Sequence, residues 1–384
     1  MRQACCFIAL FALSAAPLAA EGIADQFKWN FQARVRGEMR QNVYDFDSSR
    51  SAVTDDAFDL RLASIEIGDP KHFSLKLGRQ VLSYGDERLV GPLEWLNFSR
   101  TFDAVKLHYQ ALSWWIDAFT SSVVRLHESE FNRSDWLGNG EARQQFFSGL
   151  YFSSQFLPFQ ATDLYAFHLH EESFTGGTDF MTLGTRQKGD PAKLAGWDYT
   201  VELVGQTGQI NGHPLSAYAN HLEGGYNWLK SAWKPRLALE YSSGSGDSDP
   251  NDGRVQTFQN LFPTNHPPYG LMDTFSWQNM HNLVLRLAAQ PHPKVKTTLD
   301  FHSFWLTTTG DAWYRANGST RVRNINPNAN SHAGCELDFT VHAMLTQHLD
   351  MLFGYSHFFA AAYLADTGAS DDADFAYLML TLNY

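Results

Sequence analysis

The side chains best suited to bind an anion gather in one segment, residues 79–103, which mixes charged and aromatic residues. Its arginines, Arg79, Arg88 and Arg100, can each offer a fork of N–H donors to a carboxylate. The partner carboxylates lie either on this segment or on a ligand, and an aromatic ring can stack on the face of a sugar. The other candidates in the segment are Asp86, Glu87, Trp95, Phe98 and Asp103.

The same segment is expected to form a constriction. It is flanked by two stretches, 73–78 and 102–110, in which apolar and polar residues alternate with the period of a β-strand. A hairpin loop of this length has a function or is disordered, and its mixture of charged residues with Trp and Phe argues against disorder. In the alternative interpretation, Arg–Asp pairs only keep the loop folded. The two interpretations are compatible, because a constriction must be rigid to select between solutes.

Strand-like alternation continues along the chain and is clearest in residues 27–40. That length exceeds the ~5–6 residues of an average soluble strand and suits the ~9–11 that cross a bilayer with tilt. The pattern predicts an all-β protein, a transmembrane antiparallel β-barrel of about sixteen strands (16–18). The further strands are expected near 57–67, 72–83, 102–110, 113–125, 144–154, 162–171, 179–187, 196–208, 214–228, 234–242, 277–289, 294–307, 333–343, 347–360 and 373–384.

The connections between these strands alternate in length. Short turns are expected at 68–71, 110–112, 188–195, 229–233, 290–293 and 345–347. Long polar loops are expected at 41–56, 84–101, 126–143, 243–276, 308–332 and 361–372. Short periplasmic turns and long extracellular loops are typical of outer-membrane barrels, and an even strand count puts both termini on the periplasmic side.

The N-terminus has the features of a secretory signal peptide. Arg2 precedes an apolar core at 7–13, and small residues lead up to Ala20. We expect residues 1–20 to be the signal and residues 21–384 to form one barrel. The apolar run is too short to cross a bilayer as a helix.

Composition narrows the class of protein. The formal net charge of −12 argues against a nucleic-acid partner. A mean hydropathy of −0.32 fits a barrel, because only the outward half of each strand must be apolar. Aromatic residues make up 14% of the chain, as expected if they form girdles at the two membrane interfaces. Cys335 is the only cysteine after Ala20, so no intrachain disulfide is expected.

Three stretches stand in the order GRQVLSYGDERLVGPLEWLNFSRTFDAVKL (78–107), SGSGDSDPNDGRVQTFQNLFPTNHPPYGLMDTFSWQN (243–279) and GYSHFF (354–359). Together they resemble the alginate-export family of bacterial outer-membrane β-barrels. The resemblance implies a channel in the cell outer membrane for alginate or a related anionic polysaccharide. Its expected partners are outer-membrane lipid, an anionic polysaccharide or sugar acid, and the barrel assembly machinery, which the C-terminal aromatic residue Tyr384 suits.

A barrel of this size leaves a water-filled lumen, so its function depends on inward-facing side chains. Strand phase predicts lumen-facing basic residues at Arg34, Arg36, Arg40, Arg61, Lys76, Lys106, Arg236 and Arg286. It predicts lumen-facing acidic residues at Glu38, Asp59, Asp117, Glu202, Glu240, Asp300, Glu336 and Asp338. The basic residues either create a field that draws an anionic chain through the pore, or form ion pairs that only stiffen the wall.

Other functions fit parts of the sequence. Because the chain is acidic, a general porin or an uptake porin for small solutes, including sugar acids, is the main alternative. A plugged structural barrel and an outer-membrane hydrolase are further alternatives. The sequence contains no nucleophile elbow and no H-E-x-x-H motif, so no enzyme is expected.

A short acidic stretch invites comparison with a calcium loop. Asp247, Asp249 and Asp252 precede Gly253, but the glycine falls one place late for an EF-hand and no Glu follows at the twelfth position. A solvated turn therefore fits this stretch better than a structural divalent-cation site. No other cofactor is expected.

Overall fold

Antiparallel β-sheet makes up nearly all of the computed structural model, which describes residues 32–41, 61–95, 99–125, 132–136, 144–172, 176–320 and 325–383. Among these residues no helix is long and apolar enough to cross a membrane. The described elements are β1 (Gln32–Gln41), β2 (Ala63–Asp69), β3 (Phe73–Gln80), β4 (Phe102–Gln110), β5 (Trp114–Arg125), β6 (Arg133–Ser134), β7 (Gln145–Ser154), β8 (Gln160–Glu171), β9 (Thr178–Gly189), β10 (Trp197–Ile210), β11 (His213–Asn227), β12 (Arg236–Gly244), β13 (Met280–His292), β14 (Val295–Leu306), β15 (His332–Met344), β16 (Leu349–Ala360), α1 (Ala362–Thr367) and β17 (Ala373–Asn383).

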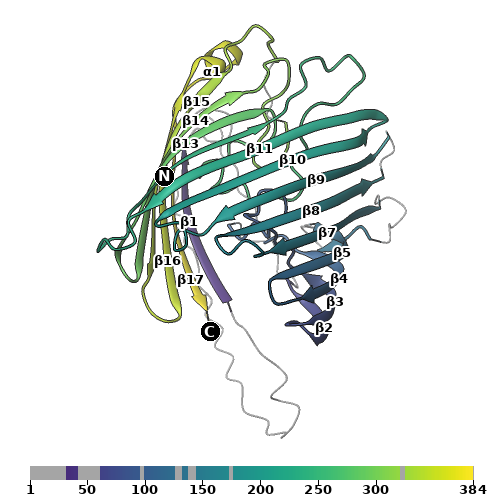
Figure 1. Ribbon diagram of the computed structural model, residues 1–384. Helices are drawn as coiled ribbons and strands as arrows, with labels where there is room; N and C mark the ends of the chain where they lie inside the picture. Colours follow the sequence, from purple (N-terminus) through teal and green to yellow (C-terminus); the bar gives the residue numbers. More distant parts are fainter. Residues whose placement is uncertain are drawn as a thin grey trace, which may run out of the picture.

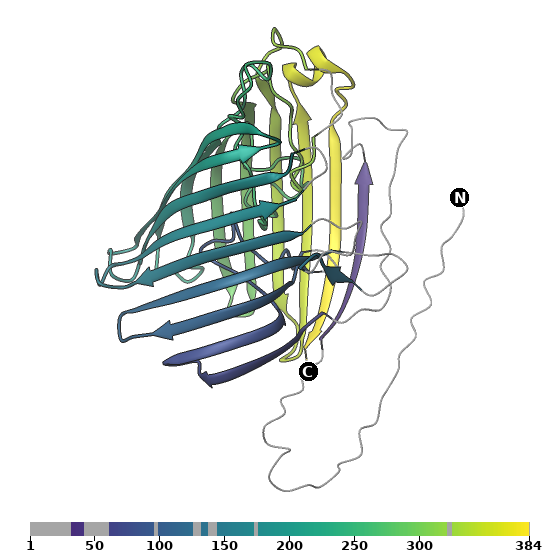
Figure 2. The same ribbon diagram turned by 90° about the vertical axis from the view of Figure 1, so that its right-hand side faces the viewer.

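Sixteen of these strands form one curved wall (Figure 1). From β2 onward each wall strand pairs antiparallel with the next one along the chain, and the two-residue β6 pairs only with β5. The first and last strands also pair, from Gln32↔Asn383 to Gln41↔Asp374. No pairing joins β1 to β2 within the described ranges, so the expected closed cylinder is incomplete at this seam (Figure 2).

The wall buries polar side chains and exposes apolar ones, which is the reverse of a soluble protein. On β13 and β14, Leu285, Leu299 and Phe301 are 51%, 41% and 42% exposed. The residues that alternate with them, such as Asp300 and His302, are 6% and 0% exposed. Strands with an apolar outer face and a polar inner face are stable when lipid surrounds the wall. The alternation in the sequence therefore predicted the two faces correctly.

The connections lie at two ends of the wall, which we call the turn side and the loop side (Figure 1). The turn side carries short connections such as 70–72, 111–113 and 293–294, and the loop side carries 81–101, 245–279 and 307–331. One loop-side connection is short, because Asn211 and Gly212, with φ of 52° and 82°, form a two-residue turn between β10 and β11. In barrels of this kind the turn side faces the periplasm.

The structure confirms an all-β antiparallel fold of about sixteen strands. β1 falls at the strand expected from the alternation in residues 27–40. Residues 27–31 lie outside the described residues, as do the expected signal at 1–20 and the loop residues 42–60. The sequence did not predict β6 or α1. Both are short elements inside expected loops, where no periodic pattern can accumulate.

Candidate functional site

Two long loops contact each other inside the wall, the β3–β4 loop (81–101) and the β12–β13 loop (245–279). Their backbones form two reciprocal hydrogen bonds: Gly91 N–H donates to Phe262 O, and Phe262 N–H donates to Leu89 O, both at 2.8 Å. The Phe262 ring packs edge-on against Phe102 and Phe147, which belong to the inner face of the wall. The joined loops therefore fill part of the lumen.

Local sequence explains why the loops approach so closely. A Cβ atom at Gly91 would lie 2.3 Å from Thr264 Oγ1, so a side chain there would push the two backbones apart. A few residues further on, the Trp95 ring stacks on His266 of the other loop, with centroids 3.8 Å apart. Its edge also meets Tyr377 of β17 at 4.4 Å, which seats the joined loops against the wall.

The β3–β4 loop is tied to the wall by charged side chains. Arg88 Nη2 lies 3.2 Å from Glu240 Oε1 and 2.9 Å from His221 Nε2. Asp86 lies 2.6 Å from Lys188 Nζ and 3.2 Å from Arg186 Nη1. Burial acts to raise the pKa of Asp86, but the two cations outweigh it and the pKa is lowered. Asp86 is thus held as a charged partner.

The β12–β13 loop is held through its backbone. Leu271 N–H donates to Asp338 Oδ2 at 3.1 Å, and Met272 N–H donates to Glu336 Oε1 at 2.9 Å. Both carboxylates are buried on β15, where an unpaired acid would be costly. Gly270, with φ of +86°, lets the chain turn over Glu336, whose Oε2 would be 2.6 Å from an added Cβ.

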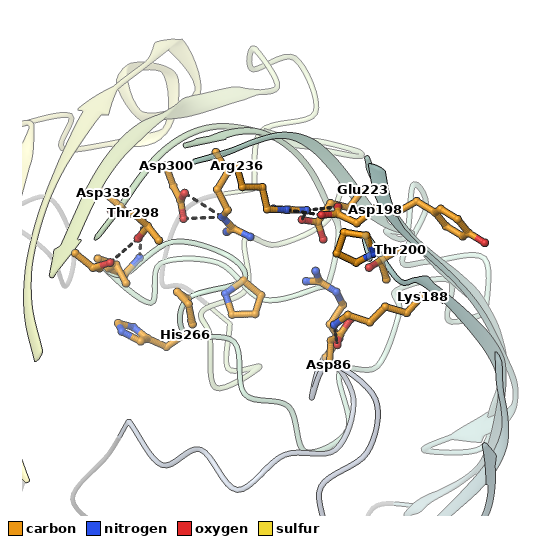
Figure 3. Close-up of a pocket in the computed structure, with 18 of the residues that line it drawn as sticks. Asp86, Lys188, Asp198, Thr200, Glu223, Arg236, His266, Thr298, Asp300 and Asp338 are labelled. Carbon is orange, nitrogen blue, oxygen red and sulfur yellow. Dashed lines mark hydrogen bonds and ion pairs between the residues drawn. The ribbon is translucent and has the colours of Figure 1, made fainter. Parts of the chain in front are cut away.

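Below the joined loops lies a cavity of about 660 Å³ (Figure 3). His266, Pro267 and Pro268 line it from the loops, and strand residues line it from the wall. Several of those strand residues flank short turns: Lys188 and Asp198 stand on either side of the 190–196 connection. The cavity therefore lies on the turn side of the joined loops.

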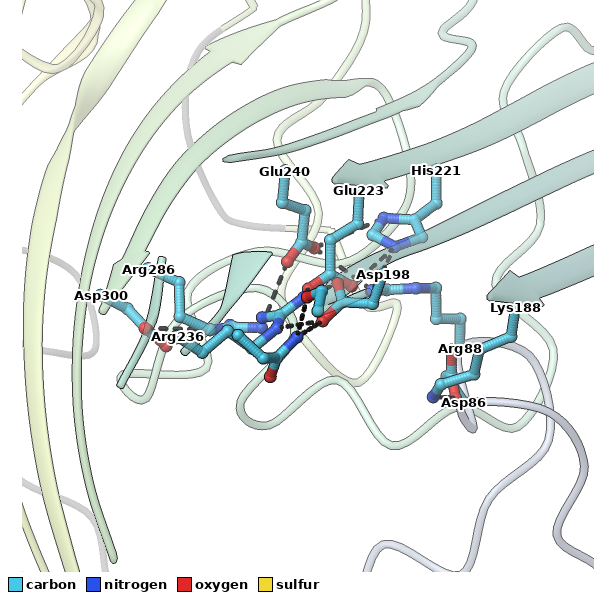
Figure 4. A network of polar contacts seen from close by, with 12 residues as sticks. Asp86, Arg88, Lys188, Asp198, His221, Glu223, Arg236, Glu240, Arg286 and Asp300 are labelled. Atoms are coloured by element: carbon cyan, nitrogen blue, oxygen red, sulfur yellow. Dashed lines mark hydrogen bonds and ion pairs between the residues drawn. The ribbon is translucent and has the colours of Figure 1, made fainter. Parts of the chain in front are cut away.

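Two arginines of the wall dominate this cavity (Figure 4). Arg236 donates from Nε and Nη2 to Asp198 at 2.8 and 2.6 Å, and its Nη2 also donates to Glu223 at 2.7 Å. Arg286 donates from Nε to Asp300 at 2.9 Å and from Nη1 to Glu240 at 3.3 Å.

Neither guanidinium group is fully used. Within the described residues, Arg236 Nη1 and Arg286 Nη2 take part in no hydrogen bond. Neither atom is among the buried side-chain atoms that lack a partner, so both are accessible from the cavity. Each arginine therefore keeps N–H donors for a carboxylate that enters the cavity.

The sequence matches the family described as Alginate export over residues 11–377. The chain belongs to the alginate-export family. Among curated proteins, none matches the sequence. Family and fold together make this an outer-membrane protein of the channel-forming type.

Solved structures from Pseudomonas aeruginosa share the fold of this alginate-export family member. OpdQ is 12% identical with a TM-score of 0.55, covering 84% of this chain and 78% of its own. OccK11 (OpdR) is 14% identical with a TM-score of 0.54, covering 81% and 77%. The outer membrane protein OprD is 11% identical with a TM-score of 0.52, covering 81% and 75%.

The structure brings several expected site residues of this family member to the lumen. Asp86, Arg88, Arg236 and Arg286 line the cavity itself. Lys106 also lies on the inner face, where its Nζ is 3.1 Å from Asp117 Oδ2.

Two expected site residues are wrong as pore-lining residues. Arg79 and Asp103 are direct cross-strand partners and share a face with Leu77 and Val105. That face points outward, since Val105 is 38% exposed. Arg79 Nε donates to Asp103 Oδ1 at 2.9 Å, so the two side chains satisfy each other outside the lumen. Both residues stand at the strand ends next to the loop, but their side chains follow the phase of the strands.

Trp95 and Arg100 occupy the interface between the loops, so the expected stacking of Trp95 on a ligand sugar is not supported. Trp95 is 6% exposed and already stacked. Arg100 Nη1 donates to Gly91 O and Pro263 O, and burial lowers its pKa to about 10. Glu87 accepts from Ser83 Oγ at 2.7 Å. These residues have partners within or beside the joined loops, so they are not placed to bind a solute in the cavity.

The remaining expected residues lie elsewhere. Arg61 precedes β2 and pairs with Glu94 of the β3–β4 loop at 2.7 Å. The backbone positions of Arg34, Arg36 and Arg40 lie on β1, but their side chains are outside the described residues. Phe98 is outside them as well.

Sequence reasoning missed several inward residues. Among them are Asp198 and Glu223 of the cavity, together with Arg186, Lys188 and His221. Arg186 and Lys188 are in phase with the buried Thr182 and Phe180 on β9, so strand phase could have found them. His221 is equally in phase with the buried Ala219 and Ala217 on β11.

The acidic stretch of the β12–β13 loop caps its own backbone. Asp247 Oδ1 accepts from Asp249 N–H, and Asp252 Oδ1 accepts from Arg254 N–H. Asp249 Oδ1 accepts from Asn251 N–H. Within the described ranges, no group of three or more His, Cys, Asp or Glu residues could hold a metal ion. The stretch has the contacts of a series of Asx turns.

Proposed function

We propose that this protein is a channel, and not an enzyme, that passes an anionic polysaccharide such as alginate, or related uronate-containing solutes, across the outer membrane. One observation carries the proposal: the turn-side cavity presents Arg236 and Arg286 with unused N–H donors. A uronate carboxylate accepts such a fork of donors in two parallel hydrogen bonds.

The carboxylates around these arginines favour weak, reversible binding of a uronate, as a channel requires, over tight binding. Asp198, Glu223 and Asp300 already compensate the two guanidinium charges. An arriving uronate must therefore share the arginines with resident carboxylates and is held weakly. Conduction requires binding that is strong enough to admit a solute and weak enough to release it.

The location of the cavity supports export. A solute that reaches the cavity from the turn side meets the arginines before it meets the joined loops. Since the turn side is periplasmic in such barrels, the arrangement suits a chain delivered from the periplasm.

A second function, uptake of small solutes including sugar acids, is favoured by the charge balance of the same cavity. Asp86, Asp198, Glu223, Asp300 and Asp338 contribute five carboxylates to the lining. Four basic residues face them, Arg88, Lys188, Arg236 and Arg286. Because the lining has no excess of positive charge, a short acid suffers less repulsion in it than a long polyanion.

Planar-bilayer recording distinguishes the two. Oligomannuronate, glucuronate and neutral oligosaccharides are added separately to each side of a single channel. Export predicts that oligomannuronate blocks the current more strongly than glucuronate and chiefly from the periplasmic side. Stronger block by the monomeric acid, or equal block by neutral sugars, would overturn the export proposal.

A further inference from the structure

A second group of lumen-facing side chains lies on β3, β4 and β5, away from the arginine cavity. Lys76 of β3 stands directly opposite Lys106 of β4. Lys106 in turn stands opposite Phe119 of β5, which is buried on the inner face. Like charges in directly opposed positions of a sheet destabilise it, so this pair is costly unless an anion lies between or beside the two ammonium groups.

The nearby carboxylate does not neutralise both lysines. Asp117 lies 3.1 Å from Lys106 Nζ and 2.5 Å from His108 Nδ1, and it also accepts from Tyr84 OH at 3.0 Å. Its two oxygens are therefore occupied. Glu66 of β2 stands directly opposite Lys76 on its other side, where it accepts from Ser74 Oγ at 2.7 Å. Within the described part of the chain, no ion pair of 4 Å or less joins Lys76 to either carboxylate.

An aromatic platform lies next to these lysines. Trp115 alternates with the outward Trp114 and shares its face with Asp117 and Phe119. Its ring stacks on Tyr151 with centroids 5.4 Å apart, and it lies 5.9 Å from His108. Trp115 is only partly buried, so part of its indole surface remains open to the lumen.

The position of this group along the wall is also informative. Trp115 is the second residue of β5 and follows the short connection at 111–113. The aromatic platform therefore lies near the turn-side mouth. The lysines are level with Phe119, two same-face positions deeper than Trp115. A chain that enters from the periplasm meets this wall before it reaches the joined loops.

We propose that Lys76, Lys106 and Trp115 form a binding subsite for a short uronate segment of an anionic polysaccharide at the turn-side mouth. This proposal rests on the proposed function and adds a place where the polymer first binds. One sugar ring stacks on the indole, and the carboxylate of a following residue in the chain is drawn to Lys106 and Lys76.

The experiment measures block of single channels by oligomannuronate added from the periplasmic side. Trp115→Ala should weaken the block by about tenfold, the scale of one lost stacking contact. Trp115→Phe should retain part of the affinity. Trp114→Ala is the matched control, since Trp114 is the adjacent tryptophan on the outer face.

The lysine is tested separately. Lys76→Gln should weaken block by oligomannuronate and leave block by neutral mannose oligomers unchanged. If Trp115→Ala and Lys76→Gln channels are both blocked as strongly as the wild type, the subsite is overturned and the export proposal stands. If oligomannuronate fails to block the wild-type channel from either side, the proposed function itself is wrong. Should Trp115→Ala fail to assemble, Trp115→Phe and Lys76→Gln give the same decision.

Discussion

The guanidinium group of Arg88 meets the carboxylate of Glu240 at 3.2 Å, although 152 positions separate the two residues. The side chains are 6% and 1% exposed, so water screens their interaction very little. Through this contact the β3–β4 loop is tied to β12 inside the lumen. The position of the joined loops thus depends on two distant parts of the chain.

Arg88→Met should loosen the β3–β4 loop. Removing one partner of a buried ion pair costs on the order of 3–5 kcal/mol, although Glu240 retains Arg286 as a partner here. We expect larger and noisier single-channel conductance with normal barrel assembly. Arg79→Met, on the outer face, is the control and should leave conductance unchanged. Equal effects of the two substitutions would contradict the proposed tether.

Deletion of residues 85–98 should raise single-channel conductance further. The deletion removes Arg88, Gly91 and Trp95, and with them most contacts between the two loops. Conductance recordings before and after deletion give the result directly. A conductance equal to that of the wild type would mean that the β12–β13 loop sets the constriction by itself.

Replacing Arg236 and Arg286 with Ala should lower the permeability of anions relative to cations. The substitutions leave Asp198, Glu223 and Asp300 without their main counter-charges, so the cavity becomes more negative. Reversal potentials in a salt gradient measure the change.

The reversal potentials of Arg34→Ala and Arg36→Ala, on β1, are measured in the same salt gradient and compared with those of the Arg236 and Arg286 variants. Unchanged reversal potentials in the Arg236 and Arg286 variants would remove those arginines from the account of selectivity.

The double substitution of Glu336 by Gln and Asp338 by Asn should weaken the seat of the β12–β13 loop. Neutral amide oxygens accept the backbone N–H groups of Leu271 and Met272 less strongly than carboxylates do. Hydrogen exchange should speed up at these two amides. The amide of Phe262, which donates to Leu89 O, serves as the internal reference. Slower or unchanged exchange at Leu271 and Met272 would mean that Glu336 and Asp338 do not hold the β12–β13 loop in place.

The ion pairs that Asp86 forms with Arg186 and Lys188 should persist in mild acid. Burial favours a raised pKa, yet Arg186 and Lys188 lower it below the ordinary value of 3.8. A carboxyl group with a lowered folded-state pKa contributes stability above its unfolded pKa and loses it as pH falls through the folded value. We therefore expect the difference in conductance between the wild type and Asp86→Asn to persist from pH 7 to about pH 4 and to disappear only below that, given the direction of the shift. Asp86→Asn should already show the higher conductance at pH 7.

The sequence by itself determined the wall and its two faces. Alternation on β13 and β14 assigned Leu285, Leu299 and Phe301 to lipid and Arg286 and Asp300 to the lumen, as the exposures confirm. This worked because the direction of a side chain on a strand depends only on its position relative to its neighbours in the chain. Family membership could likewise be recognised from local stretches of the sequence, and the match over residues 11–377 confirms it.

Only the tertiary structure decided which loop residues meet. Gly91 pairs with Phe262, Trp95 stacks on His266, and Arg88 reaches Glu240. No periodic pattern links such positions, because their proximity follows from the curvature of the whole sheet. Arg79 and Asp103 are different, because strand phase alone groups them with Leu77 and Val105, and the structure shows them paired across the outer face of two neighbouring strands.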